Sequence, residues 1–174
     1  MPEITTKSIV LYGNISQDAN LWLNWYEYAV RQINETGFTS NYLGIIGNKF
    51  NSGKVQKLSR AEKKLKAELA QGCEISSLSI YSLPEDFKQA AFDYNIYFSR
   101  NLKFKNSHII LTFANEAFLK LDIQYIIDEA QKHIEMKSGQ IFELSNFENP
   151  QIYASRVNSV SAFKTLKIIE EWSK

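Results

Sequence analysis

The stretch that decides the fold runs from residue 75 to residue 114 and reads ISSLSIYSLPEDFKQAAFDYNIYFSRNLKFKNSHIILTFA. Apolar and polar side chains alternate over residues 75–81 and again over residues 92–100, as expected of half-buried strands. Residues 108–114 have the β-branched and aromatic content of a central strand. A block of three strands predicts a mainly antiparallel sheet.

The sequence before this block predicts a strand, a helix and a second strand. Residues 4–12 are rich in β-branched side chains and end at a Gly-Asn turn dipeptide, which indicates a strand. Residues 18–35 carry apolar side chains at helical spacing and are followed by Gly37, a typical helix stop. We expect a short strand over residues 42–46 and an exposed, glycine-rich loop after it.

Three further helices and two single helical turns are expected from capping and periodicity. Ser59 and Glu62 match the capping box, in which each side chain bonds the backbone at the start of a helix, and Gly72 would end that helix. Pro84 suits the first position of a single helical turn, and Asn149-Pro150 can start another. The remaining elements are a helix over residues 122–137 ended by Gly139, a strand over residues 140–144 and a helix over residues 160–172.

These elements predict an α+β fold in one domain spanning residues 1–174. The expected architecture is a mainly antiparallel sheet of about five to six strands, with about four helices chiefly on one face. The length is typical of one domain, and a hydrophobic fraction of 44% with a charged fraction of 22% is close to globular averages.

Composition also bounds the compartment. Cys73 is the one cysteine, so the chain can form no intramolecular disulfide and holds too few thiolates for a structural zinc site. No apolar run approaches the ~18–20 residues that a membrane span needs, and the first residues lack the pattern of a secretory signal. We therefore expect a cytoplasmic protein without membrane association.

No motif in the sequence predicts catalysis. Residues 47–55 approach the phosphate-binding loop, but five residues separate the two glycines and Val55 stands where a hydroxyl would hold magnesium. His108 and His133 have no partner at metal-ligating spacing, and Cys73 lacks the setting of a reactive thiol. We expect no catalytic residues, no metal and no cofactor.

The clearest asymmetry of the chain is a basic segment. Residues 47–71 hold seven lysines and arginines against two glutamates, a local charge of +5 that leaves −4 on the rest of a chain whose total is +1. Such polarity can steer a partner of opposite charge. As a hypothesis, the partner contacts are Lys49, Phe50, Lys54, Lys57 and Arg60, with Phe50 as the apolar anchor, and a second candidate patch is Glu85, Asp86 and Phe87.

Two segments carry a resemblance to a known class of proteins. LSRAEKKL at residues 58–65 and LSIYSLPEDF at residues 78–87 resemble segments of immunity proteins of bacterial polymorphic-toxin and type VI secretion systems. The resemblance implies a protein that binds a cognate toxin and occludes its active site, without chemistry of its own. It includes no mechanistic motif, so it assigns no individual residue.

Two other classes of function remain open at this point. A small-molecule-binding domain or enzyme would have a deep apolar pocket with a few convergent polar groups. A nucleic-acid-binding module would use the basic segment 49–66, displayed on one continuous face. Phe50 is the one aromatic residue of that segment, so the stacking platform of a single-strand binder is not evident and nucleic acid is the less favoured partner.

Overall fold

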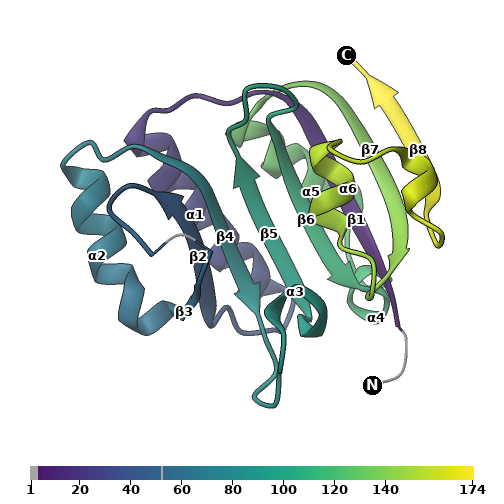
Figure 1. The fold of residues 1–174 in the computed structure, drawn as a ribbon, viewed down its shortest axis with the longest axis horizontal. Coiled ribbons are helices and arrows are strands. Elements are labelled where there is room, and N and C mark those ends of the chain that lie inside the picture. The colour runs from purple at the N-terminus through teal and green to yellow at the C-terminus, as the bar shows by residue number, and fades with distance from the viewer. Residues whose placement is uncertain (1–3, 52) are drawn as a thin grey trace.

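A computed structural model describes residues 4–51 and 53–174 and shows a broad twisted sheet with helices on both faces (Figure 1). The sheet has eight strands in the order β3-β2-β4-β5-β6-β1-β7-β8, and every pair of neighbours is antiparallel. The strands are β1 (Thr5–Asn14), β2 (Tyr42–Gly47), β3 (Val55–Lys57), β4 (Ile75–Ser82), β5 (Ile96–Asn101), β6 (His108–Ala114), β7 (Glu135–Ser145) and β8 (Lys167–Ser173).

Six α-helices and two 3₁₀ turns are described in the same residues. They are α1 (Ala19–Glu35), α2 (Leu58–Ala70), α3 (Ala90–Asp93), α4 (Asn115–Phe118), α5 (Ile123–Ala130), η1 (Gln131–His133), α6 (Pro150–Ser155) and η2 (Val160–Ala162). The predicted α+β fold with an antiparallel sheet is confirmed, whereas the predicted five to six strands and four helices are too few.

Strand β1 is an interior strand of the sheet, paired along both edges and covered on both faces. It pairs with β6 on one side and β7 on the other. Ile9 and Leu11 point into the larger core, which contains side chains of α1, α2 and α5, and Val10 and Tyr12 point into a smaller core closed by Tyr153 of α6. Figure 1 shows α1 and α5 behind the sheet and α6 in front of it.

The predicted C-terminal helix over residues 160–172 is wrong. Residues 160–162 form one 3₁₀ turn, and residues 167–173 form β8, which pairs with β7. The apolar residues that suggested a helical stripe are Phe163, Leu166 and Ile169. Phe163 and Leu166 pack against the smaller core, whereas Ile169 is about half exposed on the edge strand. Pairing with an available strand edge therefore outweighed a weak helical pattern.

The predicted helix over residues 122–137 is half as long as expected. Asp122 caps α5 by accepting from the N–H of Tyr125, and the helix passes into η1 and then into β7. Gly139 ends no helix, since it lies within β7 opposite Leu11 of β1. The strand predicted over residues 140–144 is thus the second half of a longer one.

The strand predicted over residues 92–100 begins later. The carboxylate of Asp93 accepts from the N–H groups of Lys88 and Gln89 at 2.7 and 2.8 Å, which folds residues 90–93 into the helical turn α3. Pro84 starts no helix; its carbonyl accepts from the N–H of Phe87 in an ordinary turn.

The capping box at Ser59 is absent from α2. The helix begins at Leu58, and no side chain caps it. The N–H of Leu58 donates instead to the carbonyl of Asn41, immediately before β2, at 2.9 Å. A tertiary bond to a neighbouring segment thus satisfies a group that a local cap normally serves.

Among the helices of residues 4–51 and 53–174, none combines the length and the apolar character of a membrane span.

Candidate functional site

The structure places the residues of the basic segment at opposite ends of strand β2, and so at opposite rims of the sheet. Lys49 follows Gly47, at the end of β2 that pairs with Ile75, whereas Lys57 pairs with Tyr42 at the other end of the same strand. Tyr42 and Gly47 are the first and last residues of β2, and the five steps between them span roughly 16 Å. Lys49, Lys54, Lys57 and Arg60 are all exposed, but they do not form one compact patch.

Phe50 is placed differently from its surface neighbours. It is half-buried and packs against the larger core, with the ammonium of Lys64 5.3 Å from its ring centroid. The ring therefore already has apolar and cationic contacts within the chain.

The two predicted patches meet at a groove on the Lys57 end. Lys57 and Glu85 both line this groove of about 660 Å³, together with Asn41 and Tyr42. Its floor is braced by Asn41, whose side-chain amide donates to the carbonyl of Leu83 at 2.7 Å and accepts from the N–H of Leu83 at 2.9 Å. Glu85 and Asp86 are exposed, while Phe87 is half-buried with its ring edge against Tyr42, 5.1 Å between centroids. The groove carries charges of both signs.

The opposite end of the sheet presents a feature that the sequence reasoning missed. Phe104, on the connection between β5 and β6, is 99% exposed, and the exposed side chains of Lys103 and Lys105 flank it. Phenylalanine is among the residue types most often buried, and Phe104 is the most exposed of the large hydrophobic side chains in the described residues.

The connection that carries Phe104 is well braced. The hydroxyl of Ser107 accepts from the N–H of Lys103 and donates to its carbonyl, both at 2.9 Å. The carbonyl of Ser107 accepts from the N–H of Gly13 in the adjoining β1. Asn106 adopts a left-handed conformation with φ of 61°, which asparagine tolerates better than most residues. These hydrogen bonds fix the loop that holds the Phe104 ring in solvent.

A sequence signal for this site did exist. The run Lys103-Phe104-Lys105-Asn106 interrupts the strand pattern with an aromatic residue between two charges and a turn former. The wealth of aromatics in the chain concealed it, because a phenylalanine supplies core and interface alike.

His108 lies in a buried hydrogen-bond chain. Its Nδ1–H donates to the carbonyl of Asn106 at 2.7 Å, and Nε2 accepts from the side-chain amide of Gln151 at 3.0 Å. The amide oxygen of Gln151 accepts from the hydroxyl of Tyr97 at 3.3 Å. Burial lowers the pKa of His108 to about 4, so the neutral ring is a positioning element of this chain.

The other reactive side chains are not assembled with His108. Burial, followed by the charge of Glu68, raises the pKa of the Cys73 thiol, which keeps it protonated. Burial and the nearby Arg100 lower the pKa of His133 to about 4, and its ring stacks on Tyr28 at 4.7 Å. Over residues 4–51 and 53–174, no group of three or more His, Cys, Asp or Glu side chains could hold a metal.

A small pocket lies beside the His108 chain. Tyr81, Tyr94, Tyr97 and Gln151 line a space of about 210 Å³. Pockets for small-molecule ligands are typically about 300–1,000 Å³, so this space suits at most a very small ligand.

These features define an α+β protein with an antiparallel sheet between helices, a polar groove at one end of the strands and an exposed aromatic hairpin at the other. Such a fold is found in the Pseudomonas aeruginosa T6SS protein PA0821, with a TM-score of 0.50 and 12% sequence identity. The match covers 85% of this chain and 42% of that one, and at this identity it shows the fold alone. No family model and no curated protein matches the chain.

Proposed function

We propose that this protein is an immunity protein that binds a cognate bacterial effector in the cytoplasm and occludes it. The observation that carries the proposal is the Phe104 hairpin: an apolar ring, 99% exposed, on a braced loop between two lysines. Aromatic side chains are enriched in protein interfaces, so a ring that a braced loop holds in water is available to enter a pocket of a partner.

The hairpin has the parts of a binding hot spot. Aromatic anchors that fill a pocket of the partner typically contribute about 2 kcal/mol or more, whereas the charged rim around them contributes mainly to the rate of association. Phe104 is the anchor, and Lys103 and Lys105 favour a partner with an acidic cleft. An inhibitor that inserts a projecting ring into a cleft blocks access to that cleft.

Two similarities support the type VI secretion context. The solved structure with the same fold is described as a T6SS protein. Residues 58–65 and 78–87 independently resemble segments of immunity proteins of such systems.

The contacts proposed from the sequence fall on two surfaces. Lys49 belongs to the same end of the sheet as the hairpin, since Gly47 pairs with Ile75 and the N–H of Leu102 donates to Ser76. Lys57 and Glu85 line the groove at the other end of the strands. Arg60, Asp86 and Phe87 do not line it but follow these two residues closely in the sequence. We propose the hairpin end as the principal contact and the groove as the alternative interface.

Neither rival function has an observation of equal weight. The tyrosine-lined pocket of about 210 Å³ is small for a metabolite, and larger hollows, of about 660 and 440 Å³, are lined mainly by polar and charged side chains instead of the apolar ones typical of metabolite sites. The basic segment is divided between opposite ends of strand β2 instead of following one face.

Co-expression with a candidate toxic effector, taken from a reading frame next to the gene of this chain, tests the proposal. The wild-type protein should restore growth, and Phe104→Asp should abolish protection while the protein stays folded. Leu119→Asp is the matched control, because Leu119 is a second exposed apolar side chain, 70% exposed, on the α4 connection. Paired charge reversal, Lys57→Glu with Glu85→Lys, examines the groove. A wild-type protein that gives no protection contradicts the proposed function, and loss of protection only in the groove variant moves the interface there.

A further inference from the structure

Arg100 is a cation buried in the larger core. It lies near the end of β5 and is 1% exposed. Its guanidinium carbon lies 4.3 Å from the ring centroid of Trp22, a cation–π contact. Nε–H donates to the carbonyl of His133 at 3.0 Å, and Nη2 donates to the carbonyl of Ser16 over a long 3.4 Å.

These contacts leave the guanidinium under-satisfied. It carries five N–H donors. Its Nη1 is shielded from solvent and has no hydrogen-bond partner among the described residues. No carboxylate of the described residues lies within 4.0 Å of the Arg100 guanidinium. The ion pairs of these residues join Arg31 to Glu35, Lys66 to Glu62 and Lys132 to Glu129.

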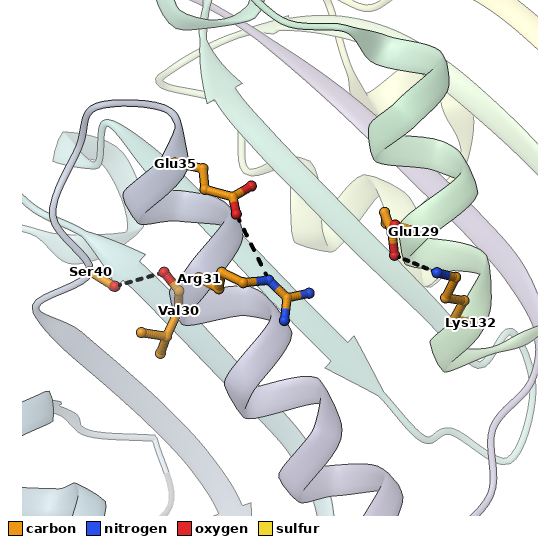
Figure 2. A network of polar contacts seen from close by, with 6 residues as sticks. All are labelled: Val30, Arg31, Glu35, Ser40, Glu129 and Lys132. Carbon is orange, nitrogen blue, oxygen red and sulfur yellow. Dashed lines mark hydrogen bonds and ion pairs between the residues drawn. The ribbon is translucent and has the colours of Figure 1, made fainter.

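The distribution of ion pairs is the reverse of the usual one. Figure 2 shows the Arg31–Glu35 pair on α1 and the Lys132–Glu129 pair on the neighbouring helical segment. The nitrogen–oxygen distances of these pairs are 4.0 and 2.8 Å. These cations are exposed and gain little from their partners. The buried cation, for which a counter-charge matters most, lacks one. Desolvation lowers the pKa of Arg100 to about 10, so the guanidinium remains charged at neutral pH.

A pocket opens beside this cation. It has a volume of about 440 Å³, and Arg100 shares its wall with Ser16, Leu21, Lys132, His133 and Glu135. The charges that face it are the guanidinium, the Lys132 ammonium, which Glu129 already pairs, and one carboxylate, Glu135. The pocket is thus polar, larger than a single anionic group and provided with an unpaired buried cation.

We propose that this pocket binds one oxyanion group, a carboxylate or a phosphate, which pairs with the guanidinium of Arg100. Because Nη1 is enclosed, the guanidinium turns toward the anion and gives up its long bond to Ser16. Planar guanidinium groups bind such oxyanions through two parallel N–H bonds, which the unused donors of Arg100 supply.

The position of the pocket links it to the hairpin. Asn14 also lines it, and Gly13, the residue before, donates its N–H to the carbonyl of Ser107 in the Phe104 connection. One part of the inference rests on the proposed function: in the complex with the effector, the oxyanion is an acidic side chain of the effector, next to the cleft that Phe104 enters. The binding of a free oxyanion does not depend on that complex.

Arginine side-chain NMR of the full chain tests the site directly. The sequence holds four arginines, Arg31, Arg60, Arg100 and Arg156, so four Nε–H signals are expected, and the one that Arg100→Lys removes is that of Arg100. Sodium acetate and sodium phosphate are titrated separately at pH 7 and constant ionic strength, with chloride as the balancing salt. The Arg100 signal should shift saturably in the millimolar range, while the other three shift weakly and without saturation.

A second variant keeps the test independent of the folding of Arg100 variants. Glu135→Gln removes the one unpaired carboxylate of the pocket and should tighten anion binding about two- to fivefold, the usual range for one exposed charge interaction. Saturation by acetate alone indicates a carboxylate ligand, and saturation by phosphate alone a phosphorylated one. An Arg100 signal that follows the other arginines in both salts overturns the proposal. That result leaves the growth test of the proposed function unaffected, and loss of growth protection leaves the titration unaffected.

Discussion

Gly139 of β7 lies directly beneath the indole ring of Trp172, its partner across the β7–β8 pair. A methyl group at position 139 would overlap three atoms of that ring, so Gly139→Ala must displace Trp172 from the edge of the larger core. Overpacking of this kind typically costs about 1–3 kcal/mol. We expect that loss of unfolding free energy in urea titrations, together with faster amide exchange in β8.

A matched glycine separates this clash from the general effect of substituting glycine. Gly44 lies within β2, and a methyl group there would meet Tyr81 at an ordinary 3.8 Å. Gly44→Ala should be neutral or slightly stabilising, because it reduces the freedom of the unfolded chain. Equal losses at the two glycines would show that Trp172 does not pack over Gly139.

Asn41→Ala should destabilise the groove that Lys57 and Glu85 line. The Asn41 side chain satisfies both backbone groups of the buried Leu83, and leaving a buried N–H without a partner costs about 1–3 kcal/mol. The expected result is a lower thermal midpoint and faster exchange of the Leu83 amide. Asn48→Ala, on the exposed β2–β3 connection, is the control and should change neither.

Phe104→Ser should leave stability within about 0.5 kcal/mol of wild type, because the ring contributes almost no buried area. Phe98, fully buried two residues before Arg100, is the contrasting position, and Phe98→Ala should cost about 3–5 kcal/mol. Chemical denaturation of both variants compares the two rings. A large loss at Phe104 would mean that the ring packs within the chain and is no partner anchor.

Stability should fall as the pH drops below about 6.5. Burial depresses the pKa of His108 to about 4, below the 6.5 of an unfolded histidine, so between these values the unfolded chain binds the extra proton. Stability due to this residue is then complete above pH 6.5 and declines toward pH 4 by about 1.4 kcal/mol per pH unit at most. Unfolding free energies of the wild type and His108→Gln, measured from pH 7 to pH 4.5, should converge as the pH falls. Parallel curves would contradict a neutral, buried His108.

The sequence predicts well those elements whose signals are local. Asp18 caps α1 and Gly37 follows its end with φ of +93°, as the composition of that segment indicates. Gly139 was wrongly predicted to end a helix, because glycine is common after helices and also at positions where a large ring packs closely against the backbone. Only the position of Trp172, set by the pairing of β7 with β8, decides between these uses.

The candidate site was harder to predict than the fold. Lys49 and Lys57 are close in sequence, but β2 and β3 form a hairpin that carries them to different ends. Phe50 and Phe104 both stand among lysines in the sequence, and tertiary packing alone distinguishes the half-buried ring from the exposed one. The Arg100 pocket has no sequence signature, since its walls come from three distant segments.

The place of β1 between β6 and β7 also governs the order in which this chain folds. Tyr12 pairs with His108 and Ser138, so β1 is synthesised roughly a hundred residues before either of its neighbours. At ribosomal rates of about 5–20 residues per second, the apolar segment Ile9-Val10-Leu11 is synthesised several seconds before the strands β6 and β7 with which it pairs. The antiparallel β2–β4–β5 segment can pair during that interval, and we expect β1 to be the segment of the nascent chain most in need of protection from aggregation.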